Sequence, residues 1–321
     1  MDEKTLPNGA DGNAQIPQAK VQTMKTRRRQ QIIFIVALLF IPIAHWFIWA
    51  GVSLSSISLA FQNNYREFTF ENFVKAKEMF IDSNDSLQIS LLNTVKTFFY
   101  SEVVGVPITL TVSYFMYKQI KGYKTLRVIF YLPHIISGIV LVTAFRELVS
   151  VKGPIIALLD KWGIDRPRNG FLHTKGSATN LIIFFMIWKG ACGNILFYSA
   201  MGRIPPELIE VGRLDGLQLF KELIYVIMPL IWPTFSTTVI LDLCGILGAG
   251  GPVLLFGGDV ISQGKASTIS YWFFSKVYGG GAFGIGSYGV MSAVGLIFTA
   301  ISVPITLTIR HLLDKVSTGE F

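Results

Sequence analysis

Charged residues are scarce in this chain of 321 residues: they make up 15% of it, whereas hydrophobic residues make up 51%. Its mean hydropathy is +0.51. An ordinary soluble domain carries about 25% charged residues. The shortage of charge therefore excludes that class and indicates a protein with several membrane-spanning segments.

Cysteine and histidine are rare as well. The two cysteines, Cys192 and Cys244, both lie in apolar stretches, where a packing thiol is expected rather than a disulfide or a metal ligand. The four histidines are scattered without paired spacing. Because a membrane-embedded enzyme needs a nucleophile with a base, or a set of metal ligands, the sequence argues against that alternative.

The chain also lacks a convincing nucleotide-binding loop. The segment 258–266 has five residues rather than four between its glycines, and Ala266 has no hydroxyl for magnesium. Residues 284–289 match the dinucleotide-binding pattern literally but follow no strand of a βαβ unit. We therefore expect no catalytic site and no cofactor bound by this chain.

Long apolar runs dominate what is present. A membrane-spanning helix needs about 20 mostly apolar residues, and only helices fit these runs because a barrel would show alternating strands. We expect an all-α membrane protein with six transmembrane helices. The expected spans are roughly 32–54, 89–117, 126–149, 179–201, 228–250 and 287–309, with kinks at Pro42, Pro107, Pro133 and Pro304.

The segments outside the spans complete the expected organisation. Residues 1–31 are polar and predict a disordered cytoplasmic tail, and residues 317–321 predict a short C-terminal tail after a permease-like domain at 32–316. The first span is longer than the apolar part of a signal peptide, so we expect it to stay as an anchor.

Basic residues indicate the orientation of the spans. Lys25, Arg27, Arg28 and Arg29 precede the first span, and the loop between the second and third spans carries Lys118, Lys121, Lys124 and Arg127 without an acid. Both should face the cytoplasm. The loop at 150–178 is basic too, which weakens the assignment slightly. The net charge of +8 is thus read as a signal of topology, not of nucleic-acid binding.

The polar loop at 202–227 is the most informative segment. Pro205-Pro206 can start a helix, and Leu208, Val211 and Leu214 recur at helical spacing before Gly216, a suitable left-handed end. A second short helix is expected around Phe220, Leu223 and Ile224, with Pro229 at the entry to the fifth span. The pattern predicts a cytoplasmic knob of two amphipathic helices whose apolar ridge lies in a groove of another protein.

This loop resembles the cytoplasmic signature of the permease subunits of binding-protein-dependent (type I) ABC importers. That signature reads Glu-Ala-Ala, a later Gly and then Ile-x-Leu-Pro, and it maps onto Glu210-Val211-Gly212, Gly216 and Ile227-Met228-Pro229. Further blocks look like the carbohydrate-uptake branch of the family. They are Asn93-Thr94, Tyr131-Leu132-Pro133, Lys152-Gly153-Pro154 and Ile204-Pro205-Pro206-Glu207-Leu208.

The match has departures. Val211 and Gly212 replace both alanines, Met228 replaces leucine, and Leu217 stands where a small residue is common. A β-branched residue and a glycine lower helix propensity by up to about 1 kcal/mol each. The groove of the partner is therefore expected to have a somewhat different shape.

The resemblance implies a set of partners and a mechanism. It implies the type I importer transmembrane fold, two separate ATPase subunits that use ATP and Mg, an extracytoplasmic solute-binding protein and a second permease subunit. A non-identical second permease is favoured, with a homodimer left open. The chain would be a multi-pass protein of the bacterial cytoplasmic membrane with both termini inside, importing an oligosaccharide or polysaccharide fragment by alternating access. The implied ATPase-coupling residues are Glu207, Glu210, Gly212, Asp215, Gly216, Phe220 and Pro229.

Charges within the spans are candidates for the substrate pathway because they are costly in the bilayer. We hypothesise that Lys189 and Asp242 face the central cavity and pair with each other or contact substrate, and a purely structural pair is an equal alternative. Neighbouring candidates are Trp188, Asn194, Tyr198 and Gly248. Lys189 and the basic outer loop lean towards an anionic sugar, although the charge of the cargo stays open.

A secondary transporter or channel is the other functional class to consider. Such a protein would carry its own coupling and would be expected to show inverted repeats with ion ligands inside the membrane. No such repeat is visible in the sequence, and the knob at 202–227 would then have no purpose.

Overall fold

The computed structural model describes residues 18–318 except 64, 82–85, 165–166, 168, 192–194, 249–250 and 279–286. The chain divides into two compact units, Met1–Ser58 and Leu59–Phe321, which are treated separately. In the described residues, β structure is limited to one isolated bridge between Gln62 and Phe68. The expected all-α fold is confirmed.

The first unit is built from one long helix, α1 (Gln18–Ala60), which runs on into the start of the second unit. Its part from Arg29 to Ala60 is long and apolar enough to cross a membrane, with a mean hydropathy of 2.5. The prediction of a disordered tail over 1–31 is wrong for residues 18–31, which are helical, while residues 1–17 lie outside the described part. The Lys, Gln, Met and Arg residues before the apolar run are good helix formers, so the helix extends through them.

The second unit contains the other helices of the described residues, several of them short. In chain order they are α2 (Glu71–Ile81), α3 (Leu87–Tyr100), α4 (Val106–Tyr117), α5 (Tyr123–Ile135), α6 (Gly138–Leu148), α7 (Pro154–Lys161), α8 (Ser177–Ala191), α9 (Ile195–Met201), α10 (Pro206–Leu214), α11 (Leu219–Glu222), α12 (Met228–Cys244), α13 (Gly251–Leu255), α14 (Gly258–Gly264), α15 (Ile269–Tyr278) and α16 (Ser287–Thr318). Two π turns, η1 (Ser101–Gly105) and η3 (Leu223–Ile227), and one 3-10 turn, η2 (Phe171–His173), connect some of them.

Four helical stretches of this unit are long and apolar enough to cross a membrane: Leu87–Tyr117, Ser177–Met201, Leu219–Cys244 and Tyr288–Val316. They correspond to the second, fourth, fifth and sixth expected spans. The single helix expected over 126–149 is wrong, because α5 and α6 meet there at a bend of 104°. Counting that bent pair as one span gives up to six spans in the described residues.

The bend follows from local backbone chemistry. Pro133 lies near the end of α5 and has no N–H to continue the helical hydrogen bonding. Ile136 and Ser137 are then extended, with ψ near 139° and 135°, before Gly138 opens α6. The expected kink at Pro133 is therefore a complete break a few residues later.

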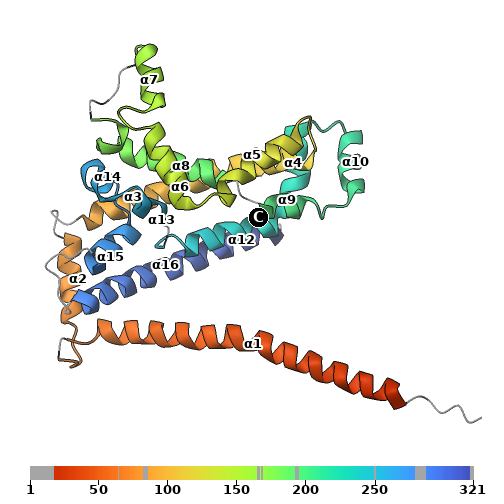
Figure 1. Cartoon of the computed structure of the whole chain (residues 1–321), viewed down its shortest axis with the longest axis horizontal. Coiled ribbons are helices and arrows are strands. Elements are labelled where there is room, and N and C mark those ends of the chain that lie inside the picture. The colour runs from red at the N-terminus through yellow and green to blue at the C-terminus, as the bar shows by residue number, and fades with distance from the viewer. Residues whose placement is uncertain are drawn as a thin grey trace, which may run out of the picture. The chain divides into compact units, whose positions relative to one another are not determined.

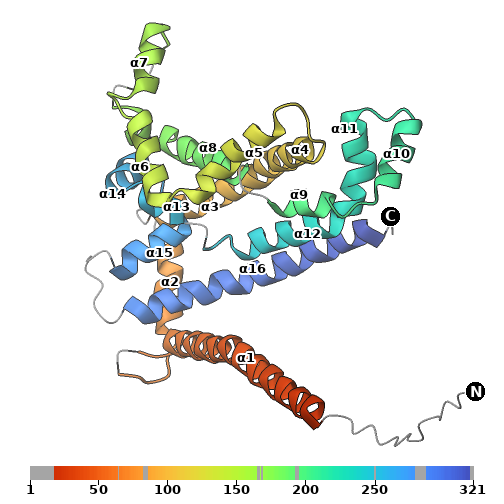
Figure 2. The ribbon, with the colours of Figure 1, turned by 45° about the vertical axis from the view of Figure 1, so that its right-hand side comes forward.

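The long helices α12 and α16 lie side by side in Figures 1 and 2. Near their ends the indole Nε1 of Trp232 donates a hydrogen bond of 3.0 Å to the carbonyl oxygen of Leu313. The end of α16 thus lies at the same end of the unit as α10 and α11 (Figure 2). A buried cluster there joins α4, α9, α10 and η3 through Tyr114, Phe197, Ile209 and Ile227.

Candidate functional site

The loop that connects α9 to α12 holds α10, and α10 ends in a well-defined C-terminal motif. Gly216 has a φ of +76°, a left-handed conformation that glycine adopts without strain. The N–H of Leu217 donates to the carbonyl oxygen of Gly212 at 3.0 Å, the bond typical of a Schellman motif. The predicted left-handed end of the helix at Gly216 is confirmed.

Gly212 faces inward, and its missing side chain leaves room for its neighbours. A Cβ atom built on Gly212 would lie 3.3 Å from Cδ1 of Leu217 and 3.4 Å from Cγ2 of Val226. Two departures from the family signature, Gly212 and Leu217, are therefore in contact. The leucine occupies space that the side chain of an alanine at position 212 would need.

The second half of the loop differs from expectation. The predicted separate short helix is instead the beginning of the fifth apolar stretch, which runs from Leu219 through α11, η3 and α12 to Cys244. Pro229 lies in the first turn of α12, inside this stretch and not at its entry. The wider π turn of η3 precedes it and relieves the usual clash of a proline ring with the carbonyl one turn earlier.

The two faces of α10 have different surroundings. Ile209 is buried with Leu223 and Ile227, which fastens α10 to the start of the fifth stretch. On the other face Leu208, Val211 and Leu214 form an exposed ridge, with exposed fractions between 44% and 88%. We call these three residues the α10 ridge.

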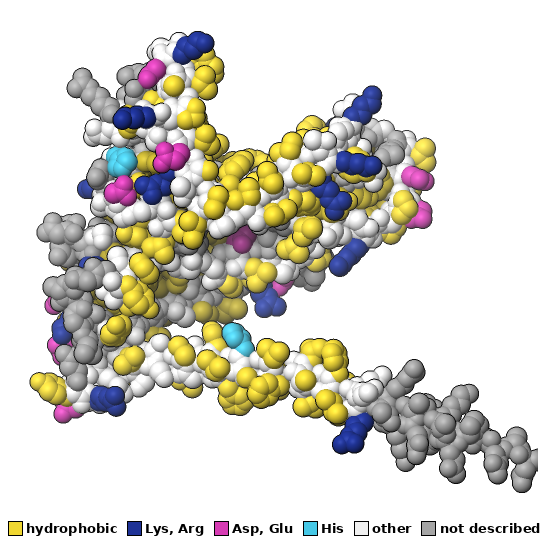
Figure 3. All heavy atoms as spheres, viewed as in Figure 1, with side chains coloured by type: hydrophobic (Ala, Val, Ile, Leu, Met, Phe, Trp, Pro, Cys, Tyr) yellow, Lys and Arg dark blue, Asp and Glu magenta, His cyan; other side chains and the backbone are white. Residues whose placement is uncertain are grey.

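Polar candidates flank the α10 ridge. Glu207 and Glu210 are exposed on α10, and acidic side chains mark its outer edge in Figure 3. Asp215 is exposed at the end of the helix. Phe220 is also exposed, and its ring meets that of Phe115 edge to face at 6.3 Å. Apolar and acidic groups therefore stand together on a surface that the second unit leaves uncovered.

A buried ion pair fixes this loop to the second span. Nζ of Lys118, just after α4, contacts Oε1 of Glu222 in α11, and the two side chains are only 9% and 2% exposed. The same ammonium group lies 5.6 Å from the ring centre of Tyr114. From the sequence, Lys118 is expected only to indicate topology and Glu222 is not a candidate, although an acid beside an apolar run is a recognisable signal.

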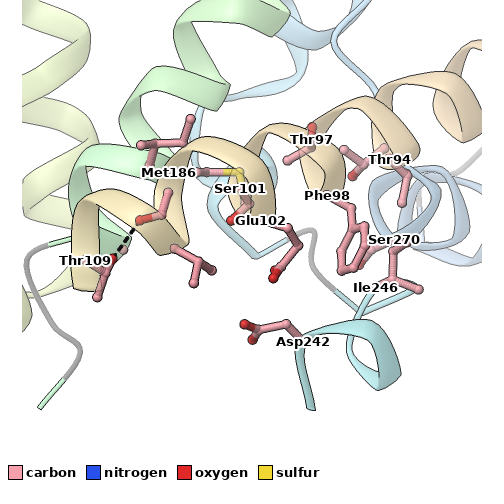
Figure 4. A pocket seen from close by; sticks show the side chains of 15 residues that line it. Thr94, Thr97, Phe98, Ser101, Glu102, Thr109, Met186, Asp242, Ile246 and Ser270 are labelled. Atoms are coloured by element: carbon pink, nitrogen blue, oxygen red, sulfur yellow. Dashed lines mark hydrogen bonds between the residues drawn. The ribbon is translucent and has the colours of Figure 1, made fainter. Parts of the chain in front are cut away.

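A cavity of about 320 Å³ lies between the second span, α8, α12 and the segment around Thr268. Six hydroxyl side chains line it: Thr94, Thr97, Ser101, Thr109, Thr268 and Ser270. Two carboxylates also belong to the described lining, and Figure 4 shows Glu102 of η1 and Asp242 of α12 turned towards each other across the cavity. The cavity suits a ligand rich in hydrogen-bonding groups.

The described residues contain no ion pair between Lys189 and Asp242, so of the hypothesised roles the direct pairing is not found. Asp242 lines the cavity, whereas Nζ of Lys189 lies 3.9 Å from the position of a Cβ on Gly138, at the break between α5 and α6. Glu102 is the charged neighbour of Asp242 instead, and the cost of a charge inside a span, applied to residues 89–117, would have singled it out.

Of the remaining pathway candidates, Trp188, Tyr198 and Gly248 are described and do not line this cavity. The ring of Trp188 packs against that of Phe185 at 5.9 Å, and the ring of Tyr198 lies 5.3 Å from the guanidinium of Arg127. The N–H of Gly248 donates to the carbonyl oxygen of Gly245. Asn194 lies outside the described residues.

A charged cluster lies at the end of the unit away from α10. Oδ2 of Asp259 in α14 is 3.3 Å from Nε2 of His173 and 3.7 Å from Nη2 of Arg146 in α6. Partial burial alone would raise the pKa of Asp259. The hydrogen bonds from His173 and the N–H of Val260, with the charge of Arg146, outweigh it and lower that pKa. The cluster links η2, α6 and α14.

Comparisons with known proteins agree with this architecture. The family described as "Binding-protein-dependent transport system inner membrane component" matches residues 103–318, more than half of the chain. One chain of a bacterial ABC transporter involved in the import of the acidic polysaccharide alginate has the same fold. It has a TM-score of 0.74 and 23% identity, with 92% of this chain and 99% of that chain covered.

Two curated relatives illustrate the range of similarity. The multiple sugar-binding transport system permease protein MsmF of Streptococcus mutans is 28% identical over 60% of this chain and 64% of its own length. The diacetylchitobiose uptake system permease protein NgcF of Streptomyces coelicolor is 23% identical over 98% of this chain and 92% of its own length. Together with the family match, these relatives show that the chain is a multi-pass protein that belongs to the inner-membrane components of binding-protein-dependent transport systems.

Proposed function

We propose that this chain is a permease subunit of an ABC importer that moves an oligosaccharide into the cytoplasm by alternating access. ATP and Mg would be used by two separate ATPase subunits. The observation that carries the proposal is the α10 ridge, an exposed apolar strip on a helix whose other face is anchored in the buried cluster around Ile209. A helix of this kind fits a groove of another protein.

A continuous set of contacts leads from this ridge to the cavity. The buried face of α10 is joined to η3 through Ile209, α11 is joined to the end of α4 through Glu222 and Lys118, and α4 directly follows η1, which bears Glu102. Movement of α10 would therefore displace the wall of the cavity. An ATPase subunit produces such movement only if it binds the two states of the permease with different affinity.

The end of the second unit that carries α10 also indicates how the chain is oriented in the membrane. The turn after α4, with its basic residues, α10 and the end of α16 all lie there (Figure 2). Because short basic loops stay in the cytoplasm, we place this end and the C-terminus inside, and we expect the N-terminus there too. The cluster of Asp259, His173 and Arg146 then faces outward, towards the solute-binding protein.

The nature of the cargo is supported by the cavity and by the relatives. MsmF and NgcF are named for sugar uptake, and the hydroxyl-rich cavity suits a sugar. The solved alginate transporter is also described in complex with an alginate pentasaccharide-bound periplasmic protein. By analogy, this chain would work with such a protein and with a second permease, for which we favour a non-identical subunit.

Co-purification followed by reconstitution tests the proposal. Affinity purification of this chain from its native membrane should retain an ATPase subunit and a second permease. Vesicles containing that complex should take up an oligosaccharide only with ATP inside and binding protein outside. Recovery of the chain without an ATPase, or sugar flux through the chain alone, would support a secondary transporter instead.

A further inference from the structure

The cavity between η1 and α12 brings two acidic side chains together. Its described lining side chains include Glu102 and Asp242 but no Lys, Arg or His. Figure 4 shows both carboxylates turned into the same space. Within the described residues, neither takes part in an ion pair within 4.0 Å, and Oε2 of Glu102 is buried without a hydrogen-bond partner. Carboxylates at this depth are costly and often mark the path of a substrate.

A buried hydroxyl provides an independent observation at the same cavity. Thr268 is 4% exposed, and its Oγ1 has no hydrogen-bond partner in the described part of the chain. Its backbone is held in place, since the N–H of Ile269 donates to Oγ1 of Thr94 and the amide of Asn93 donates to the carbonyl oxygen of Ser267. A buried polar group normally has a partner, so a fixed and unpaired hydroxyl beside a cavity points to a ligand.

The remaining walls suit the apolar faces of a sugar ring. Phe98 and Met186 line the cavity, and Figure 4 shows the ring of Phe98 beside Glu102. Gly105 and Gly190 leave space because they have no side chains. Sugar-sized ligands are typically held by apolar walls with a few polar anchors, which is the combination found here.

We propose that this cavity is a subsite for a sugar unit that donates hydrogen bonds through hydroxyl or amino groups and carries no acidic group. The inference rests on the proposed function and specifies its substrate. A pair of carboxyl groups that shares one proton still carries a negative charge and accepts hydrogen bonds, so Glu102 and Asp242 favour donors and repel a uronic acid. This chain would thus differ in the charge of its cargo from the transporter described as importing the acidic polysaccharide alginate.

Direct binding of three disaccharides tests the inference. The chain, purified with the subunits that accompany it, is placed in lipid nanodiscs without binding protein. Saturation-transfer NMR then measures binding of cellobiose, glucosamine disaccharide and digalacturonic acid. We expect the first two to bind and digalacturonic acid to bind at least about tenfold more weakly. A clear preference for glucosamine disaccharide over cellobiose would identify the amino group as the main donor, and equal binding would identify the hydroxyls.

Variants test whether the two carboxylates cause this selectivity among the disaccharides. The double variant Glu102→Gln/Asp242→Asn should weaken the two favoured sugars by about tenfold and reduce discrimination against digalacturonic acid. Glu78→Gln, which removes an exposed carboxylate from α2, should leave all three affinities unchanged. Equal binding of digalacturonic acid to the unmodified protein, absence of binding by both other sugars, or unchanged discrimination in the double variant would overturn the inference. Because this readout needs no ATP, failure of the importer proposal would show separately, as an absence of ATP-driven uptake.

Discussion

Lys118 and Glu222 form a buried ion pair that joins the end of the second span to the helix leading into the fifth. Removing one partner of such a pair leaves a buried charge and typically costs about 3–5 kcal/mol. We expect Lys118→Met and Glu222→Gln each to lower the thermal stability of the purified protein. Each should also lower ATP-driven uptake more than ATP hydrolysis, because the loop would no longer move α4.

The swapped variant Lys118→Glu/Glu222→Lys separates pairing from the individual residues. If the pair transmits movement, the swap should recover part of both the stability and the ratio of uptake to hydrolysis. If the swapped variant is no more stable and no better coupled than the poorer single variant, the pairing of the two charges does not transmit the movement.

Gly216 is needed for its backbone conformation alone. No atom lies within 4 Å of a Cβ built on it, but its φ is +76°. Gly216→Val should therefore destabilise the end of α10 by about 1–2 kcal/mol and abolish uptake, whereas Gly216→Asn should retain most activity because asparagine tolerates this conformation. Uptake assays on both variants decide. Full activity of the valine variant would remove the role assigned to the turn.

Gly212 and Leu217 should behave as a coupled pair. Gly212→Ala gains helix propensity but brings a Cβ to 3.3 Å from Leu217 Cδ1, and Leu217→Ala loses the apolar contact of the Schellman motif. We expect Gly212→Ala/Leu217→Ala to be more stable than the sum of the single changes predicts, by about 0.5–3 kcal/mol. Thermal unfolding of the four proteins measures this coupling, and strict additivity would argue against it.

The α10 ridge should be needed for partner binding but not for folding. Val211→Asp places a charge on an exposed apolar surface and should weaken retention of the ATPase about 10- to 100-fold without lowering the melting temperature. Leu158→Asp, an equally exposed apolar site on α7, serves as the control. Normal ATPase retention by the Val211 variant would place the partner surface elsewhere.

The contacts of Asp259 with His173 and Arg146 predict that the thermal stability of the protein falls at acidic pH. The pKa of Asp259 is lower in the folded protein than in the unfolded chain, so its stabilising effect is complete above the unfolded value, about 4, and is lost as the pH falls through the lowered folded value. Asp259→Asn should therefore reduce the loss of thermal stability that the unmodified protein shows below about pH 4. Identical pH profiles would contradict this.

Much of the architecture could be predicted because hydropathy and turn chemistry are local. The apolar runs located five long candidate spans, and Gly216 marked the end of α10. The predictions that failed concerned features that depend on how the helices are placed in three dimensions. A proline signals a kink but not a bend of 104°, and favourable helix formers extended α1 back to Gln18. Lys189 lies beside Gly138 whereas Asp242 lines the cavity, and hydropathy along the sequence does not reveal where each side chain lies.

The α10 ridge also provides the most direct test of the central claim that ATPase subunits act on the permease through α10. In a chain with Cys192 and Cys244 replaced by alanine, Val211→Cys would be tested for cross-linking to the co-purified ATPase with a short bifunctional reagent, with and without ATP. Leu158→Cys is the control. We predict efficient cross-linking at position 211 that changes with ATP and none at position 158. Absence of any cross-link from position 211 in a complex that actively imports sugar would contradict the account.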